Sequence, residues 1–451
     1  MGDLARIFKA YDVRGVVPDE LDEETAEAVG AAFVEVTGAD TAVVAHDMRE
    51  SSVPLAAAFT RGAISRGADV VNAGLGSTDL LYYASGSLAL PGVMFTASHN
   101  PARYNGMKMC RAGAVPIGSG TGLVEIRDRA AEILRSGALR GAAAGRVSER
   151  DLLRGYADHL RTLVDLSGIR PLRVVVDAGN GMGGHTVPVV FEGLPVELTA
   201  LYFELDGTFP NHEANPIEPD NLRDLQKAVL DVGADIGLAF DGDADRCWVV
   251  DERGESVSPS AVTALVAVRE LARHPGATVI HNLITSRAVP EIVAEHGGRP
   301  VRTRVGHSFI KAEMARTGAV FGGEHSAHYY FKDFWFADSG MLAALHVLAA
   351  LGGQDRPLSE ILADYTRYTA SGEINSTVAD QAAAVTRVRE TFAVRDGVTF
   401  DELDGLTVSG PGWWFNLRPS NTEPLLRLNA EAADENQMAA IRDEVLAVVR
   451  S

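Results

Sequence analysis

Short runs of β-branched and apolar residues alternate along the chain with longer stretches rich in alanine and leucine. Residues 42–45 predict a strand, and residues 54–66 predict the helix that follows it, with Ser51 or Ser52 as its N-cap. This alternation is typical of α/β folds, in which helices connect largely parallel strands and cover the sheet. We therefore expect α/β units over most of the chain.

The same pattern occurs three times in succession. Each segment opens on an apolar strand, and a second apolar strand later in the segment ends in a polar loop. The opening strands are predicted at residues 42–45, 173–176 and 278–280, and the second strands at residues 92–95, 236–240 and 319–321. Because α/β folds bind ligands at the carboxyl ends of parallel strands, we expect these three loops to carry chemistry.

The last part of the chain has a different pattern. Residues 413–417 and 425–428 are strand-like on either side of a loop, and residues 436–449 predict a helix. Strands that are followed by a helix, without regular alternation, indicate an α+β domain.

Composition places the domain boundaries. Residues 136–150 are rich in Gly, Ala and Arg, residues 251–254 read as a turn, and a polar stretch begins at residue 368. We predict three related α/β domains and a C-terminal α+β domain, at residues 1–145, 146–253, 254–367 and 368–451.

Charge and cysteine content limit the classes of function. The 451 residues include 41 basic and 61 acidic side chains, a formal charge of −20, which argues against a general nucleic-acid binder. Two cysteines cannot build a disulfide framework, and the first residues contain no apolar targeting segment, so we expect a cytoplasmic protein. The apolar run at residues 341–351 is too short to span a bilayer and predicts a buried helix; no membrane partner is expected.

The strongest chemical signal is the loop at residues 241–246. Asp241, Asp243 and Asp245 occupy alternate positions, so that a tight loop would bring three carboxylates onto one hard cation, Mg²⁺ or Ca²⁺. An EF-hand is disfavoured, because Arg246 stands where that loop requires glycine and strands flank the segment. The alternative is a solvated acidic turn.

Ser98 directly follows the strand predicted at residues 92–95. With His99 beside it and Lys108 downstream, it is a candidate nucleophile or phosphoryl carrier. An ordinary Ser/Asn turn is the alternative.

Two further loops suit a phosphorylated sugar. Arg418, Ser420, Asn421 and Thr422 offer a guanidinium, two hydroxyls and an amide to a dianionic phosphate, unless they only cap a turn. Glu324 and Ser326 suit paired hydrogen bonds to vicinal sugar hydroxyls, and His328 is a candidate acid or base; a polar turn with a structural histidine is the alternative. His307 is equally open to a structural interpretation.

Residues 179–184 match the dinucleotide fingerprint G-x-G-x-x-G, and Glu204 could serve as the acid that binds ribose. A tight turn between a strand and a helix explains the same glycines without a nucleotide, and we favour that interpretation.

Together these loops resemble those of the α-D-phosphohexomutase family, most closely the bacterial enzymes that act on mannose and glucose phosphates. The matching motifs span nearly the whole chain, in the family's order, at residues 11–15, 96–101, 104–108, 241–246, 306–308, 323–328 and 418–424. The resemblance implies a heart-shaped arrangement of four domains, each contributing one loop to a central cleft.

The resemblance also implies a role for each candidate. Ser98 would carry the phosphoryl group, and Asp241, Asp243 and Asp245 would hold one Mg²⁺ together with the Ser98 phosphate. Glu324 and Ser326 would bind sugar hydroxyls, and Arg418, Ser420, Asn421 and Thr422 the phosphate that is not transferred. Further catalytic candidates are Arg14, His99, Lys108, His307 and His328, and further substrate-binding candidates are Arg246 and Arg287. Arg287 departs from the lysine of some relatives, and arginine and lysine bind phosphate differently.

The reaction so implied interconverts hexose 6-phosphate and hexose 1-phosphate through a phosphoserine enzyme and a hexose 1,6-bisphosphate, which would also serve as activator. We expect mannose and glucose phosphates as substrates, since hydrogen bonds to O3 and O4 cannot read the configuration at C2. A phosphoglucosamine mutase is the nearest alternative. An NAD-dependent oxidoreductase and a non-catalytic phosphosugar-binding protein are the alternatives from other classes.

Overall fold

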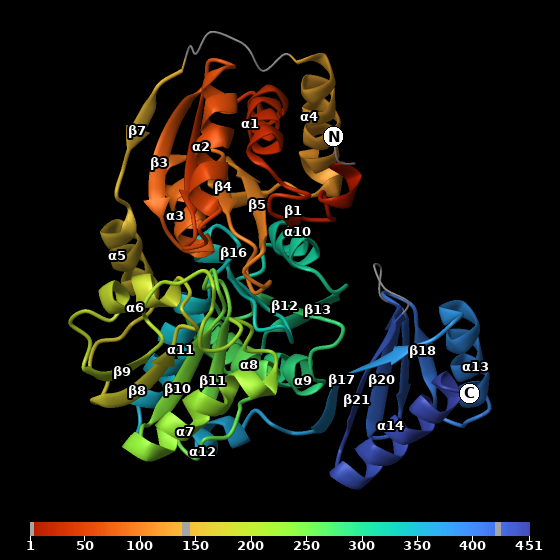
Figure 1. Cartoon of the computed structure of the whole chain (residues 1–451). Coiled ribbons are helices and arrows are strands. Elements are labelled where there is room, and N and C mark those ends of the chain that lie inside the picture. Colours follow the sequence, from red (N-terminus) through yellow and green to blue (C-terminus); the bar gives the residue numbers. More distant parts are fainter. Residues whose placement is uncertain (1–3, 138–144, 420–424) are drawn as a thin grey trace. The chain divides into compact units, whose positions relative to one another are not determined.

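The computed structural model describes residues 4–137, 145–419 and 425–451 (Figure 1). The side chains of residues 307 and 308 are outside this description. The chain forms two compact units. The first unit comprises Met1–Ser258 and Ser326–Ile361, and the second comprises Pro259–His325 and Leu362–Ser451.

The first unit begins with a mixed sheet in the order β1-β5-β4-β2-β3-β7, with β6 paired to β5. Strands β2, β3, β4 and β7 are parallel, and β5 runs antiparallel to β4 and β1. The strands are β1 Val13–Val16, β2 Thr41–His46, β3 Asp69–Leu75, β4 Gly92–Phe95, β5 Tyr104–Arg111, β6 Val115–Pro116 and β7 Val147–Glu149. The strand predicted at residues 42–45 lies within β2, and the one predicted at 92–95 is β4.

Four helices accompany this sheet: α1 Glu23–Thr37, α2 Ser52–Ile64, α3 Thr78–Leu88 and α4 Val124–Ser136. Helix α2 has Ser51, one of the two predicted residues, as its N-cap, and it begins and ends two residues before the predicted bounds. Helices α1 and α2 approach closely at two glycines. A Cβ on Gly30 would lie 2.0 Å from the Phe59 carbonyl oxygen, and one on Gly62 would lie 1.9 Å from that of Glu27. Only glycine permits this backbone contact.

The interpretation of residues 136–150 as a linker was partly wrong. Its final part is strand β7, which pairs in parallel with β3 through Val147 and Val70. Gly and Ala dominate the segment, and the short strand that it contains, Val147–Glu149, is exposed on every residue, so no hydrophobic alternation marked it.

The second sheet of the first unit has the order β11-β10-β8-β9. Strand β8 is parallel to β9 and β10, and β11 is antiparallel to β10. The elements are α5 Leu153–Leu163, β8 Leu172–Asp177, α6 Gly183–Val190, β9 Val196–Leu201, α7 Arg223–Val232, β10 Ile236–Phe240 and β11 Cys247–Asp251. Every residue of β10 is buried, as its uninterrupted apolar sequence predicts.

A hairpin of β15 Tyr329–Phe331 and β16 Ala337–Asp338 completes the first unit together with α11 Gly340–Gly352. Helix α12 Leu358–Ala363 follows. The predicted buried helix at residues 341–351 is α11, in which nearly every side chain is buried. Within the described ranges, no helix is long and apolar enough to cross a membrane.

The second unit contains a parallel group of strands, in which β12 pairs with β13 and β14. The elements are α8 Pro259–Arg273, β12 Thr278–Asn282, α9 Ala288–Glu295, β13 Arg299–Thr303, α10 His307–Thr317 and β14 Phe321–Gly323. The strand predicted at residues 319–321 starts two residues later. Gly318 and Ala319 instead close α10, because their amides donate to the Met314 carbonyl.

The C-terminal part of the second unit is an antiparallel sheet in the order β17-β21-β20-β19-β18. Its elements are β17 Thr369–Thr377, α13 Gln381–Ala393, β18 Thr399–Asp401, β19 Leu406–Gly410, β20 Trp413–Pro419, β21 Leu425–Ala432 and α14 Glu435–Val449. In its core, Trp413 and Phe415 stack, and Phe392 packs edge-on against both rings. The predicted fold class, α/β domains followed by an α+β domain, is confirmed.

Candidate active site

Ser98 lies in the loop that leaves the carboxyl end of β4. It is 5% exposed, and its φ of +50° is left-handed, a conformation that a serine rarely adopts. Its Oγ donates a hydrogen bond to Oδ2 of Asp241 at 2.8 Å, and Nδ1 of His99 lies 3.3 Å from the same hydroxyl. The structure thus joins two loops that the sequence predicted separately, 143 residues apart.

The three aspartates of the loop between β10 and β11 converge, with ligand oxygens that all lie within 4.8 Å of one another. All three side chains are buried. Lys108, from β5, pairs with Asp243 at 2.6 Å and also with Asp245, and Thr78 donates to Asp243. The loop is therefore a buried acidic site and not a solvated turn.

Two oxygens of this site, Oδ1 of Asp243 and Oδ1 of Asp245, have no hydrogen-bond partner among the described residues. A buried polar atom without a partner costs about 1–3 kcal/mol. A hard divalent cation with oxygen ligands, such as Mg²⁺, would satisfy both atoms. The donor set therefore fits the predicted metal.

The charges of the site are strongly coupled. Burial raises the pKa of Asp241 to about 7, although the adjacent guanidinium of Arg246 opposes that rise. Burial alone would also raise the pKa of Asp243, but the ammonium of Lys108 holds it below its usual range. Lys108 in turn keeps its proton, because the two carboxylates outweigh its own burial and raise its pKa. The positive charges of Lys108 and Arg246 therefore partly neutralise the carboxylates of the site.

Arg246 and Arg14 contact the two residues that follow Ser98 in its loop, His99 and Asn100. Arg246 is 4% exposed, donates through Nε to Oδ2 of Asp241 at 2.9 Å, and reaches Nδ1 of His99 at 2.6 Å. Arg14, on β1, donates to the side chains of Asn100 and Asp12. Burial, together with the two nearby guanidiniums, lowers the pKa of His99 well below its ordinary value, so its imidazole is neutral near pH 7.

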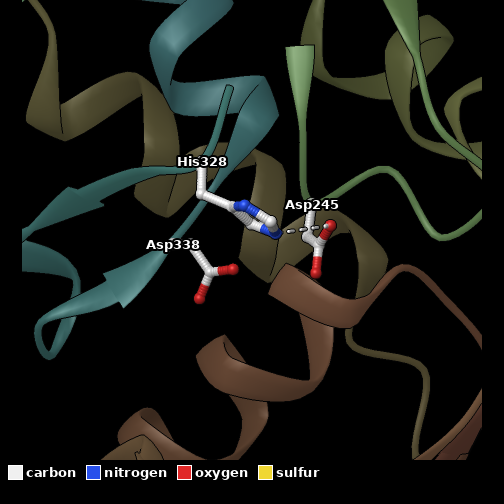
Figure 2. A group of neighbouring side chains, drawn as sticks. All are labelled: Asp245, His328 and Asp338. Carbon is white, nitrogen blue, oxygen red and sulfur yellow. Dashed lines mark ion pairs between the residues drawn. The ribbon is translucent and has the colours of Figure 1, made fainter. Parts of the chain in front are cut away.

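His328 reaches the same aspartate loop from the segment before β15 (Figure 2). Its Nε2 lies 3.9 Å from Oδ1 of Asp245, and its Nδ1 is 3.0 Å from Oγ of Ser326. Figure 2 shows the imidazole pointing at the Asp245 carboxylate, with Asp338 of β16 beside them. Ligand atoms of these three residues lie within 4.8 Å of one another.

The remaining candidates belong to the second unit. Glu324 follows β14 and is 3% exposed. Arg287 precedes α9, and its backbone amide donates to Glu431. Arg418 lies at the end of β20, 4.0 Å from Glu373. His307 begins α10 with its side chain outside the description, and Ser420, Asn421 and Thr422 lie outside the described residues.

The glycine-rich segment at residues 179–184 is the turn from β8 to α6. A Cβ on Gly181 would lie 2.7 Å from the Gly242 carbonyl oxygen, and one on Gly184 would lie 2.3 Å from that of Phe203. The backbone carbonyl of Glu204 accepts from the Asn180 side chain. The glycines therefore let this turn pack on the aspartate loop, as the tight-turn interpretation predicts.

Sequence reasoning missed Thr78 and Asp338, and also Arg49, whose guanidinium donates to the Ser98 carbonyl. Each is one polar residue without a motif, and only folding brings it to the loops. Arg49 alone had a weak signal, since it lies with Asp47 in the loop after strand β2, at the edge of the sheet where ligands were expected.

Comparison with known proteins assigns the class. Family models match four consecutive parts of the chain. They describe the α/β/α domains I, II and III of phosphoglucomutase/phosphomannomutase at residues 5–134, 154–254 and 258–368, and its C-terminal domain at residues 373–448. The chain belongs to the phosphoglucomutase/phosphomannomutase family.

Individual relatives agree over nearly the full length. The chain is 41% identical to a phosphomannomutase of Salmonella montevideo, covering 98% of this chain and 99% of that protein. It is also 41% identical to the phosphohexose mutases of Xanthomonas campestris pv. campestris, covering 97% of each. The chain is therefore a phosphohexose mutase, an isomerase of carbohydrate metabolism.

Solved structures match the same fold. A phosphoglucomutase/phosphomannomutase family protein from Burkholderia thailandensis has a TM-score of 0.90 at 34% identity, covering 100% of this chain and 98% of that one. An N-acetylphosphoglucosamine mutase of Aspergillus fumigatus, in complex with glucose 1,6-bisphosphate, has a TM-score of 0.63 at 16% identity, covering 100% and 96%. The second likeness is one of fold alone.

Proposed function

We propose that this phosphohexose mutase moves a phosphoryl group between O1 and O6 of a hexose through a phosphoserine at Ser98 and a hexose 1,6-bisphosphate. One observation supports it above the others. The Ser98 hydroxyl donates to Asp241 at 2.8 Å, beside two buried aspartate oxygens that have no hydrogen-bond partner among the described residues. A hydroxyl so placed can carry a phosphoryl group next to a bound cation.

Asp241, Asp243 and Asp245 would hold one Mg²⁺ together with an oxygen of the Ser98 phosphate. When bound, the ion offsets charge on the transferring phosphoryl group. Lys108 and Arg246 add positive charge to the same place, since both already contact the aspartates. Arg14 and His99 would complete the surroundings of Ser98.

In the first transfer, the bond from phosphorus to the Ser98 oxygen breaks, and a bond to the free sugar hydroxyl forms. The sugar hydroxyl gives its proton to a base, and the departing Ser98 oxygen takes a proton from an acid. The acid–base candidates are Lys108, His307 and His328, of which Lys108 suits the role of acid because it keeps its proton. His328 is suited to this task because its imidazole points at the aspartate loop and its other nitrogen contacts Ser326 (Figure 2). The bisphosphate then turns over and returns its other phosphoryl group to Ser98.

The sugar would be held by Glu324 and Ser326 through O3 and O4. Its second phosphate would be held by Arg418, Ser420, Asn421 and Thr422, with Arg246, Arg287 and His307 as further contacts. Arg418 supports this assignment, since its buried Nε donates to no acceptor among the described residues. The heart-shaped arrangement around a central cleft, the four domain boundaries and a cytoplasmic location remain predictions.

Mannose and glucose differ only at C2, so contacts to O3 and O4 alone predict activity on both sugar phosphates. The test compares wild type with Ser98→Ala on mannose 1-phosphate and glucose 1-phosphate, with Mg²⁺ and a trace of hexose 1,6-bisphosphate. We expect turnover of both sugars, transfer of label from the bisphosphate to wild-type protein, and loss of both in Ser98→Ala.

An active Ser98→Ala variant would refute the phosphoserine. Turnover of glucosamine phosphate in preference to both sugars would favour the phosphoglucosamine mutase, and binding without turnover would favour the non-catalytic alternative. A difference on the order of 10⁴-fold in kcat/KM between mannose and glucose would show that some residue reads C2.

A further inference from the structure

Arg49 is one of the most deeply buried charged residues in the first unit, with 1% of its surface exposed. It follows strand β2, and all of its guanidinium nitrogens donate hydrogen bonds. Its Nη2 donates to the carbonyls of Ser98 at 2.9 Å and Asn100 at 2.7 Å. Its Nη1 donates to the carbonyls of Pro101 at 2.9 Å and Tyr104 at 3.0 Å. One side chain therefore binds four backbone carbonyls, three in the loop that carries Ser98 and one at the first residue of β5.

Asp47 fixes the guanidinium in this position. Its Oδ2 accepts from Nε of Arg49 at 3.2 Å, and its Oδ1 accepts from the Arg49 amide and from the Ser52 hydroxyl. Thr96 also hydrogen-bonds Asp47, and its Oγ1 accepts from the Ser98 amide at 2.9 Å. Both the amide and the carbonyl of Ser98 are thus held by this network.

The backbone conformation of Ser98 requires restraint by its neighbours. Ser98 has a φ of +50°, which the surrounding structure must impose because a serine does not favour it. The Ser98 carbonyl also faces the aspartate loop, since a Cβ on Gly242 would lie 2.4 Å from its oxygen. The same carbonyl that Arg49 binds therefore also packs against the metal-binding loop, so its direction affects the Ser98 backbone conformation and the spacing of the two loops.

Arg49 is buried and covered by other parts of the protein, so it does not contact substrate. Its Cζ lies 5.1 Å from the ring centroid of Phe209, and a Cβ on Gly207 would lie 2.7 Å from its Cα, so the segment before α7 covers it. A guanidinium offers five N–H donors in one plane, and here that plane is directed entirely at protein groups.

We propose that Arg49 is a positioning residue for phosphoryl transfer, which holds the Ser98 loop so that Oγ stays aimed at Asp241 throughout the cycle. This proposal rests on the function proposed for Ser98. Lysine would keep the charge, but its single ammonium cannot bind four carbonyls spread from Ser98 to Tyr104. Displacement of a reacting group by about 1 Å costs on the order of 100-fold in rate.

The experiment measures kcat, KM and transfer of label from hexose 1,6-bisphosphate to Ser98 for wild type and Arg49→Lys. For Arg49→Lys we expect kcat to fall about 100-fold and labelling to slow in parallel, with KM changed less than about threefold. Arg61→Lys is the matched control, because Arg61 lies in the same unit with its side chain 48% exposed, and it should match wild type. Arg49→Ala should recover part of its kcat when guanidinium is added at concentrations that do not denature the protein.

Because a buried arginine variant can fail to fold, Thr96→Val provides a second test. It keeps the shape of the side chain and removes the hydroxyl that binds the Ser98 amide. It should lower kcat at least about tenfold without raising KM.

Three results would overturn the inference: full kcat per folded molecule in Arg49→Lys, full kcat in Thr96→Val when Arg49→Lys does not fold, or a KM increase that accounts for the whole loss. If wild type turns over substrate without labelling Ser98, the proposed function fails, and the role of Arg49 fails with it. If wild type is labelled and Arg49→Lys is unchanged, only the inference about Arg49 fails.

Discussion

Asp79 offers a quantitative test of the electrostatics of the first unit. It lies in the first turn of α3, is fully buried, and accepts hydrogen bonds from the hydroxyls of Ser77, Tyr156 and Ser339. Burial raises its pKa to about 6 from the ordinary 3.8, although the three hydroxyls oppose the rise. At about 1.4 kcal/mol per pH unit, that interval corresponds to about 3 kcal/mol.

The sign follows from proton binding. The folded protein binds the Asp79 proton more tightly than the unfolded chain does, so the resulting stabilisation is complete below about pH 4 and is lost as the pH rises through 6. Asparagine cannot ionise. Relative to wild type, Asp79→Asn should therefore gain about 3 kcal/mol of stability between pH 4 and pH 7, on top of a constant cost for its altered hydrogen bonds.

Hydrogen exchange of the amides of α3, Thr78–Leu88, measures the free energy of local opening of the helix that contains Asp79. The control is Asp220→Asn, since the Asp220 side chain is 76% exposed, and its difference from wild type should stay constant. A difference between Asp79→Asn and wild type that varies by less than about 1 kcal/mol from pH 4 to pH 7 would refute the argument.

Three further predictions concern the metal, the phosphate and the packing. Asp243→Asn should raise the Mg²⁺ concentration for half-maximal activity on the order of 100-fold, because one charged ligand is lost; a Mg²⁺ titration that matches wild type would contradict this. Arg418→Ala should raise KM for the sugar phosphate on the order of tenfold or more while changing kcat less, as steady-state kinetics would reveal; an unchanged KM would exclude it as the phosphate clamp. Gly30→Val should lower stability by about 3 kcal/mol or more, because the new Cβ would meet the Phe59 carbonyl at 2.0 Å; thermal unfolding that matches wild type would show that α1 and α2 separate freely.

Much of the fold could be predicted because the buried strands are uninterrupted apolar runs. Residues 92–95 and 236–240 match β4 and β10 at both ends. The two strands that were predicted wrongly depend on contacts that form only in the folded chain. Strand β14 begins late because the C-cap of α10 uses the residues before it, and β7 is recognised only through its pairing with β3.

The residues of the candidate site also fall into those that the sequence predicts and those that only the folded chain shows. Ser98 and the aspartate loop were found because several chemical groups occur close together in sequence. Thr78 was missed because its contact with Asp243 spans 165 residues, and Arg49 because its partners are backbone carbonyls, which leave no pattern in side-chain chemistry. Long-range contacts and main-chain acceptors become visible only when the chain is folded.

The pairing of β7 with β3 has a practical consequence for work with fragments of this chain. A fragment cut at the end of α4, Ser136, would lose β7 and leave Val70–Asn72 of β3 as an open sheet edge. Open edges recruit strands from other molecules, so such a fragment should self-associate at high concentration. A fragment that continues through Arg150, whose amide donates to the Asn72 carbonyl, would keep β7 as its edge strand. Because β7 is short and contains Glu149, this fragment should self-associate less under the same conditions.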